Sequence, residues 1–83
     1  MNLTPIQKKI LLAMSRGYTL KSHRDVEGNK VFQLHAPGGE VEAAEWEAVE
    51  YLQDHGLIDS NKKFPAATYW LTDKGQALVT RLK

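Results

Sequence analysis

Helix-capping residues and glycine-containing turns divide this 83-residue chain into short segments. Thr4 begins a Thr-x-x-Gln capping box ahead of a first segment with helical spacing of apolar residues, and Gly17 suits the end of that helix. Gly56 ends a second such segment, and Thr72 is placed to cap a third. A chain of this length has room for one hydrophobic core, so the sequence predicts a single domain over residues 1–83.

The succession of helical and extended patterns predicts an α+β fold of the winged-helix type, with the element order α-β-β-α-β-β-α. Three helices are expected, at about 5–15, 42–55 and 73–82. Two β-hairpins are expected, from strands at 18–24 and 30–35 and from strands at 57–59 and 68–71. In winged helices the second hairpin is called the wing, and the helix before it commonly enters the major groove of DNA.

Two resemblances accompany this pattern. The segment 52–58, Leu-Gln-Asp-His-Gly-Leu-Ile, then a hairpin with Tyr69, then Leu-Thr-Asp-Lys-Gly at 71–75, resembles the signature of bacterial winged helix-turn-helix domains over the last 32 residues. The N-terminal half is similar to small bacterial proteins of the YjhX-like toxin type, through Leu3, Thr4, Gln7, Leu11, Gly17, Arg24, Asp25 and Gly28. The second resemblance implies a protein target, because such proteins are described as interfering with DNA topology enzymes. The corresponding helix is basic in that type and acidic in this chain.

Acidic and basic residues are strongly segregated along the chain, although the net charge is only +1. Residues 1–30 carry six basic and two acidic side chains, and residues 61–83 carry five basic and one acidic. Residues 31–60 carry seven acidic side chains and no Lys or Arg. The helix expected at 42–55 is therefore a poor DNA-reading element, because like charges placed together at an interface cost on the order of several kcal/mol.

The side of this middle helix that faces away from the core combines Trp46 with acidic residues. A rotation of about 100° per residue places four carboxylates there, those of Glu42, Glu47, Glu50 and Asp54. An aromatic anchor with a charged rim is typical of protein-binding hot spots. We therefore predict a small, non-enzymatic bacterial or phage regulatory protein that acts through contacts with a protein partner or through self-association. In the alternatives, the acids form only a solvated helix face, and Trp46 packs under the loop that contains Pro37.

Basic residues outside the middle helix favour a second function, that of a DNA- or RNA-binding regulator. Lys62 and Lys63 lie at the tip of the expected wing, where winged helices often contact phosphate. Further basic residues are expected on the first helix and the first hairpin, namely Lys8, Lys9, Arg16, Lys21, Arg24 and Lys30. A nucleic acid bound there would avoid the acidic helix, and its affinity would fall with increasing salt.

The residue types that carry catalysis or metal binding are not grouped in this sequence. There are no cysteines, and His23, His35 and His55 lack the short spacings of a zinc site. No nucleophile motif or phosphate-binding glycine loop is recognisable, so we expect no enzymatic activity, cofactor, metal or small-molecule substrate. Without a signal-like or membrane-spanning apolar run, we expect a cytoplasmic protein that does not contact membranes.

Overall fold

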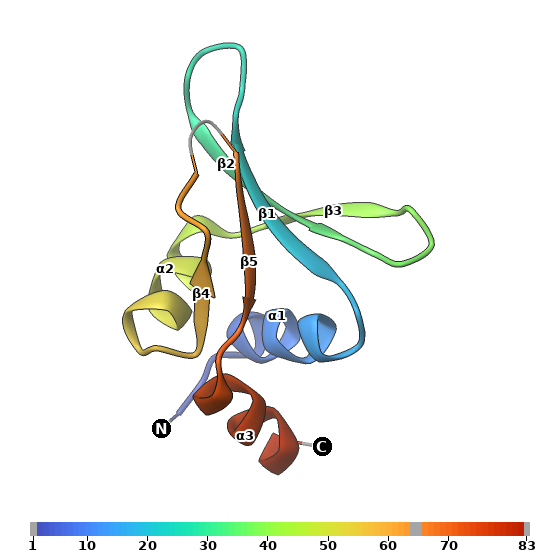
Figure 1. Cartoon of the computed structure of the whole chain (residues 1–83), viewed down its shortest axis with the longest axis vertical. Coiled ribbons are helices and arrows are strands. Elements are labelled where there is room, and N and C mark those ends of the chain that lie inside the picture. Colours follow the sequence, from blue (N-terminus) through green and yellow to red (C-terminus); the bar gives the residue numbers. More distant parts are fainter. Residues whose placement is uncertain (1, 64–65, 83) are drawn as a thin grey trace.

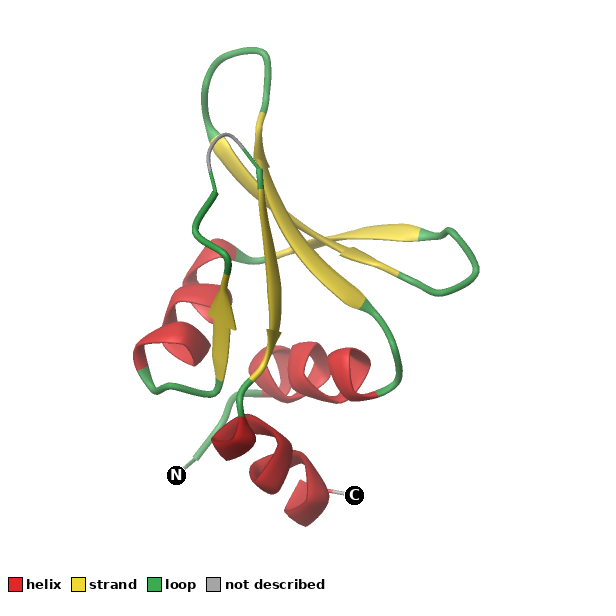
Figure 2. Cartoon of the chain, in the orientation of Figure 1, coloured by secondary structure: helices red, strands yellow, loops and turns green. Residues whose placement is uncertain are grey.

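The computed structural model describes residues 2–63 and 66–82. Within these residues the elements follow in the order α1 (Pro5–Ser15), β1 (Thr19–Arg24), β2 (Lys30–His35), β3 (Val41–Ala44), α2 (Trp46–Asp54), β4 (Ile58–Ser60), β5 (Ala67–Leu71) and α3 (Asp73–Leu82). The strands form one antiparallel sheet with the spatial order β3-β2-β1-β5-β4. Figures 1 and 2 show α1 across the lower end of this sheet, α3 below α1, and α2 beside β4.

The predicted winged-helix order is wrong, because a further strand precedes the middle helix. Residues 41–44, expected near the start of a helix at 42–55, form β3 and pair with β2. The turn before β3 contains Gly39 at φ +98°, and the Ala36 N–H donates to the Glu40 carbonyl oxygen at 2.7 Å. Apart from proline, helix propensities differ by no more than about 1 kcal/mol per residue, so pairing with a formed neighbouring strand outweighs the preference of Glu and Ala for a helix.

The two predicted hairpins are present as β1–β2 and β4–β5, but they belong to a single sheet. β1 pairs with β5, which places Leu20 opposite Tyr69 and Lys21 opposite Thr68. Successive side chains of a strand point to opposite faces. The sheet therefore has an inner face that includes Leu20 and Tyr69, and an outer face that includes Lys21 and Thr68.

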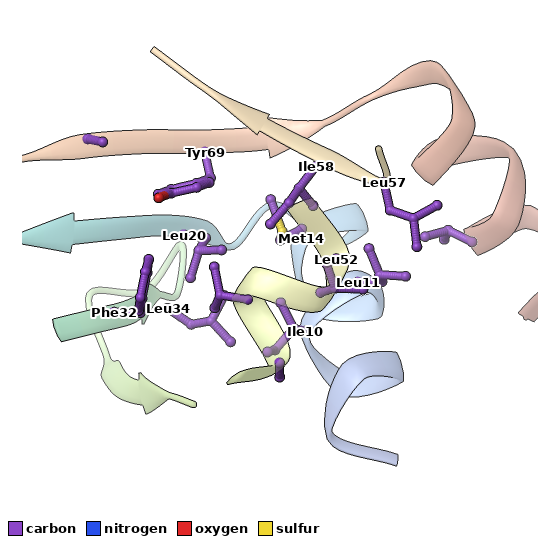
Figure 3. Packing of buried hydrophobic residues seen from close by; sticks show 14 residues of the cluster. Ile10, Leu11, Met14, Leu20, Phe32, Leu34, Leu52, Leu57, Ile58 and Tyr69 are labelled. Atoms are coloured by element: carbon purple, nitrogen blue, oxygen red, sulfur yellow. The ribbon is translucent and has the colours of Figure 1, made fainter. Parts of the chain in front are cut away.

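The hydrophobic core lies between the inner face of the sheet and the helices (Figure 3). The sheet contributes Leu20, Phe32, Leu34, Ile58, Ala67 and Tyr69. The helices contribute Ile10, Leu11, Met14, Ala48, Val49, Leu52 and Val79. The rings of Phe32 and Tyr69 meet edge to face, with their centroids 5.8 Å apart. This core determines which side of each helix remains available to a partner.

The start of α1 is closed by the predicted capping box. The Gln7 backbone N–H donates to Thr4 Oγ1 at 3.1 Å, and the Thr4 N–H donates to Gln7 Oε1 at 3.0 Å. We expect Thr4→Ala to lower the free energy of unfolding by about 1 kcal/mol, because a helix donor loses its partner. Thr4→Ser retains the hydroxyl and should unfold at nearly the wild-type urea concentration. Equal midpoints for the two variants, followed by circular dichroism, would contradict this role of the hydroxyl.

Candidate protein-binding site on helix α2

Helix α2 packs on the core with one side and leaves its other side open. Glu45 precedes the helix in an extended conformation, and Gly56, at φ +71°, lies between the helix and β4. The buried residues of α2 are Ala48, Val49 and Leu52. Because these positions project from one side of a helix, the opposite side faces solvent.

The solvent side of α2 carries Glu47, Glu50 and Asp54, and all three residues are exposed. Trp46 is the first residue of the helix and lies one turn before Glu50. Trp46 keeps 53% of its surface exposed to solvent. We call Trp46, Glu47, Glu50 and Asp54 the acidic face of α2. It contains one large apolar group and three carboxylates, and no basic residue of α2 interrupts it.

The three carboxylates of the acidic face have no ion-pair partner among residues 2–63 and 66–82. The ion pair found in this part of the chain joins Lys9 Nζ to Glu42 Oε1 at 3.2 Å. Lys74 Nζ approaches the C-terminal end of α2, but it donates to the His55 carbonyl oxygen at 2.9 Å. Exposed charges that are not compensated nearby attract a partner of opposite charge over about 8–10 Å at ordinary ionic strength.

Glu42 was predicted to lie on the same helix face, and the structure places it elsewhere. It belongs to β3, opposite Leu34 of β2, and its carboxylate contacts Lys9 of α1. Both side chains of this ion pair are well exposed, so its contribution to stability is small. The predicted acidic surface is thereby divided, with Glu42 beside α1 and the other members on α2.

The exposure of Trp46 does not fit a position beneath the Pro37 loop. The Pro37 ring instead lies next to Gly17. A Cβ added to Gly17 would be 3.4 Å from Pro37 Cγ. Trp46 also lies outside the buried core and outside the partly buried residues packed against it. An indole group with half of its surface in water is available to a partner.

The basic residues of the alternative prediction lie in separate groups. Lys8, Lys9 and Arg16 border a groove of about 500 Å³ along α1, which Glu42 also lines. Lys62 and Lys63 follow β4, in a loop at the opposite end of the sheet from α1 (Figure 1). Lys21 projects from the outer face of the sheet, and Arg24 Nη1 donates to the Gly28 carbonyl oxygen at 3.1 Å. Lys8, Lys9 and Arg16 on α1 therefore do not share a surface with Lys62 and Lys63.

Two of the three histidines, His23 and His55, contact different groups. His23 Nε2 lies 3.1 Å from Gln33 Oε1, and the ring of His55 stacks at a tilt on Tyr51 with centroids 4.1 Å apart. Among residues 2–63 and 66–82 no group of three or more His, Asp or Glu side chains is arranged to hold a metal ion. No helix in the same part of the chain is long and apolar enough to span a membrane.

Trp70 is a candidate binding residue that the sequence analysis did not single out. It lies on β5 opposite Asp59 of β4, and 46% of its surface is exposed. The alternation of buried and exposed residues along Ala67–Leu71 could have indicated it. Tyr69 is buried, so its neighbour Trp70 must point to the other face of the sheet.

Comparisons of this chain with protein-family models, curated proteins and solved structures find no match. The resemblances to winged helix-turn-helix domains and to YjhX-like proteins therefore gain no support from known relatives. The chemistry of the surfaces described above is the basis for a functional proposal.

Proposed function

We propose that this chain is a small, non-enzymatic regulatory protein that binds a basic protein partner through the acidic face of α2. The observation that carries the proposal is the exposed Trp46 beside three carboxylates that have no ion-pair partner in the described structure. A cytoplasmic location, expected from a chain without cysteine, forms part of the proposal.

Trp46 and the carboxylates have different roles in such an interface. Burial of an indole removes a large apolar surface from water, which is why tryptophan is enriched among the residues that dominate binding energy. The carboxylates of Glu47, Glu50 and Asp54 mainly accelerate the encounter with a cationic surface and select against acidic partners. A helix face that is only solvated would account for the carboxylates, but it would not account for an exposed tryptophan beside them.

Self-association is a special case of the same function. The basic groove along α1, with Lys8 and Arg16, belongs to the same molecule as the acidic face. A second copy could therefore present its groove to α2, in a head-to-tail contact between unlike surfaces. Nucleic-acid binding through Lys62, Lys63 and α1 has less support, because these groups lie at opposite ends of the sheet.

Replacing Trp46 with alanine is expected to abolish partner binding without unfolding the protein. Truncation of an aromatic anchor at a binding hot spot commonly costs about 2 kcal/mol or more of binding free energy, which corresponds to a loss of roughly 30-fold or more in affinity. The measurement is quantitative affinity capture from an extract, together with sedimentation of the purified protein to detect self-association. Val26→Ala is the control, because Val26 is fully exposed but lies in the turn between β1 and β2.

The expected result is loss of specific partners, or of self-association, in Trp46→Ala and their retention in Val26→Ala. Circular dichroism and the thermal midpoint should remain those of the wild type in both variants. Identical partners and identical sedimentation for Trp46→Ala and the wild type would overturn the proposed function.

A further inference from the structure

The outer face of the sheet is not covered by any part of the described structure. The helices pack on the inner face, and the core includes none of Lys21, Gln33, Thr68 or Trp70. The register brings three of these side chains into one row across the sheet, because Lys21 pairs with both Thr68 and Gln33. Trp70 lies two residues after Thr68 on the same face of β5.

Trp70 gives this open face a flat aromatic group. Its strand lies between β1 and β4, so the indole stands within the sheet and not at its edge. Nearly half of its surface, 46%, is exposed. Hollows of the described surface beside α1, α2 and α3 are lined by neither Trp70 nor Lys21. Protein hot spots favour pockets that enclose an anchor, whereas an exposed ring on an open sheet suits stacking of a planar group.

Cations flank the Thr68 end of this surface. Lys21 lies opposite Thr68 on β1, and the loop after β4 lies on its other side. Asn61 attaches that loop to β5, because its N–H donates to the Thr68 carbonyl oxygen and its Oδ1 accepts from the Thr68 N–H, each at 3.2 Å. Asn61 Oδ1 also accepts the Lys63 N–H at 3.2 Å, which places exposed Lys62 and Lys63 next to this end of β5.

We propose that the outer face binds single-stranded RNA, with one base stacked on Trp70 and the adjoining phosphates near Lys21, Lys62 and Lys63. Open sheets of this kind hold about two or three nucleotides by stacking on aromatic side chains, and stacking does not depend on base identity. Thr68 supplies a hydroxyl for the ribose 2′-hydroxyl. Gln33 supplies an amide N–H, since its Oε1 already contacts His23 Nε2.

Asp59 sets the direction of the bound strand. It is paired with Trp70, and its Oδ1 accepts the Ser60 N–H at 2.8 Å. Because this carboxylate repels phosphate, the RNA backbone leaves the indole on the side of Lys21 and Thr68. This surface is distinct from the acidic face of α2, so RNA and a basic protein would not compete for the same residues.

The test measures anisotropy of a fluorescein-labelled octamer of uridine with the whole chain, at low and at moderate salt. Trp70→Ala should weaken binding by roughly 5- to 150-fold, and Trp70→Phe should retain most of the affinity because it keeps an aromatic ring. Each cation that contacts phosphate should contribute about 0.7 to the slope of log affinity against log salt. Lys21→Ala should therefore reduce that slope by about 0.7, while Arg81→Ala, an exposed cation on α3, should leave it unchanged.

Several results would overturn the assignment. They are absence of RNA binding at low salt, equal affinity of the Trp70→Ala variant and the wild type, or equal binding of an RNA–DNA duplex and the single strand. A thymidine deoxyoctamer bound as tightly as the ribo-octamer would contradict recognition of the 2′-hydroxyl. If sedimentation shows a wild-type dimer that Trp70→Ala dissociates and RNA does not, the outer face is an interface between copies of this chain.

Discussion

Replacing Gly75 with alanine is expected to destabilise the fold by about 3 kcal/mol or more. Gly75 is a buried residue in the first turn of α3. A Cβ built on it would overlap the backbone carbonyl oxygen of Leu57 and would lie 2.9 Å from the Leu57 carbonyl carbon. Such an overlap with backbone cannot be relieved by a rotamer change, so α3 would have to move away from the start of β4.

Hydrogen bonds at the start of α3 oppose that movement. The Thr72 N–H donates to the Leu57 carbonyl oxygen at 3.1 Å, and the Thr72 hydroxyl donates to the Gly56 carbonyl oxygen. Thr72 Oγ1 also caps α3 by accepting the Gly75 N–H at 3.0 Å. A shift of α3 would strain or break these contacts, each of which contributes on the order of 1 kcal/mol.

Urea unfolding measures this effect, and Gly38→Ala is the matched control. A Cβ on Gly38 meets no atom within 4 Å, and Gly38 is not among the glycines with a positive φ. The control should change the free energy of unfolding by less than about 0.5 kcal/mol. Equal midpoints for the two alanine variants would show that α3 does not pack on Leu57 as described.

Leu52→Ala is expected to lower the free energy of unfolding by about 2–5 kcal/mol. Leu52 has no exposed surface and lies on the inner side of α2, among the core residues shown in Figure 3. Removing its isobutyl group leaves a cavity and takes away the contacts that attach α2 to the rest of the core. Because the chain is short, it has one hydrophobic core, and no second core can offset the loss of these contacts.

Glu50→Ala separates this packing effect from a change of helix propensity. Glu50 is exposed on the same helix, and alanine is at least as good a helix former as glutamate. Chemical denaturation should therefore give a wild-type-like midpoint for Glu50→Ala and a much lower one for Leu52→Ala. Similar midpoints for both variants would contradict the inward orientation of Leu52.

The boundary between β3 and α2 shows where prediction from sequence was insufficient. Residues 42–55 have the composition of one amphipathic helix, yet the structure divides them into Val41–Ala44 on a strand and Trp46–Asp54 on a helix. The four residues of β3 acquire their conformation by pairing with β2. A local pattern cannot reveal that the first hairpin offers a free strand edge at this position.

The same division changed the candidate site. Glu47, Glu50 and Asp54 remain together because their spacing depends only on the helix that contains them. Glu42 was assigned to their face through an assumed helical rotation, and on β3 it contacts Lys9 instead. Trp70 was overlooked because its exposure depends on the absence of a covering element over the outer face of the sheet, which is a property of the whole fold.

The sequence by itself determined the local features of this protein. The capping box of Thr4 and Gln7, the bounds of α1 and α3 and the two short-range hairpins follow from residues close together in the chain. Only the tertiary structure decided the pairing of β1 with β5, the addition of β3, and the separation of the basic residues into distinct groups. The physical reason is that these arrangements arise from hydrogen bonds and apolar contacts between distant segments, whose free energies outweigh the small conformational preferences of individual residues.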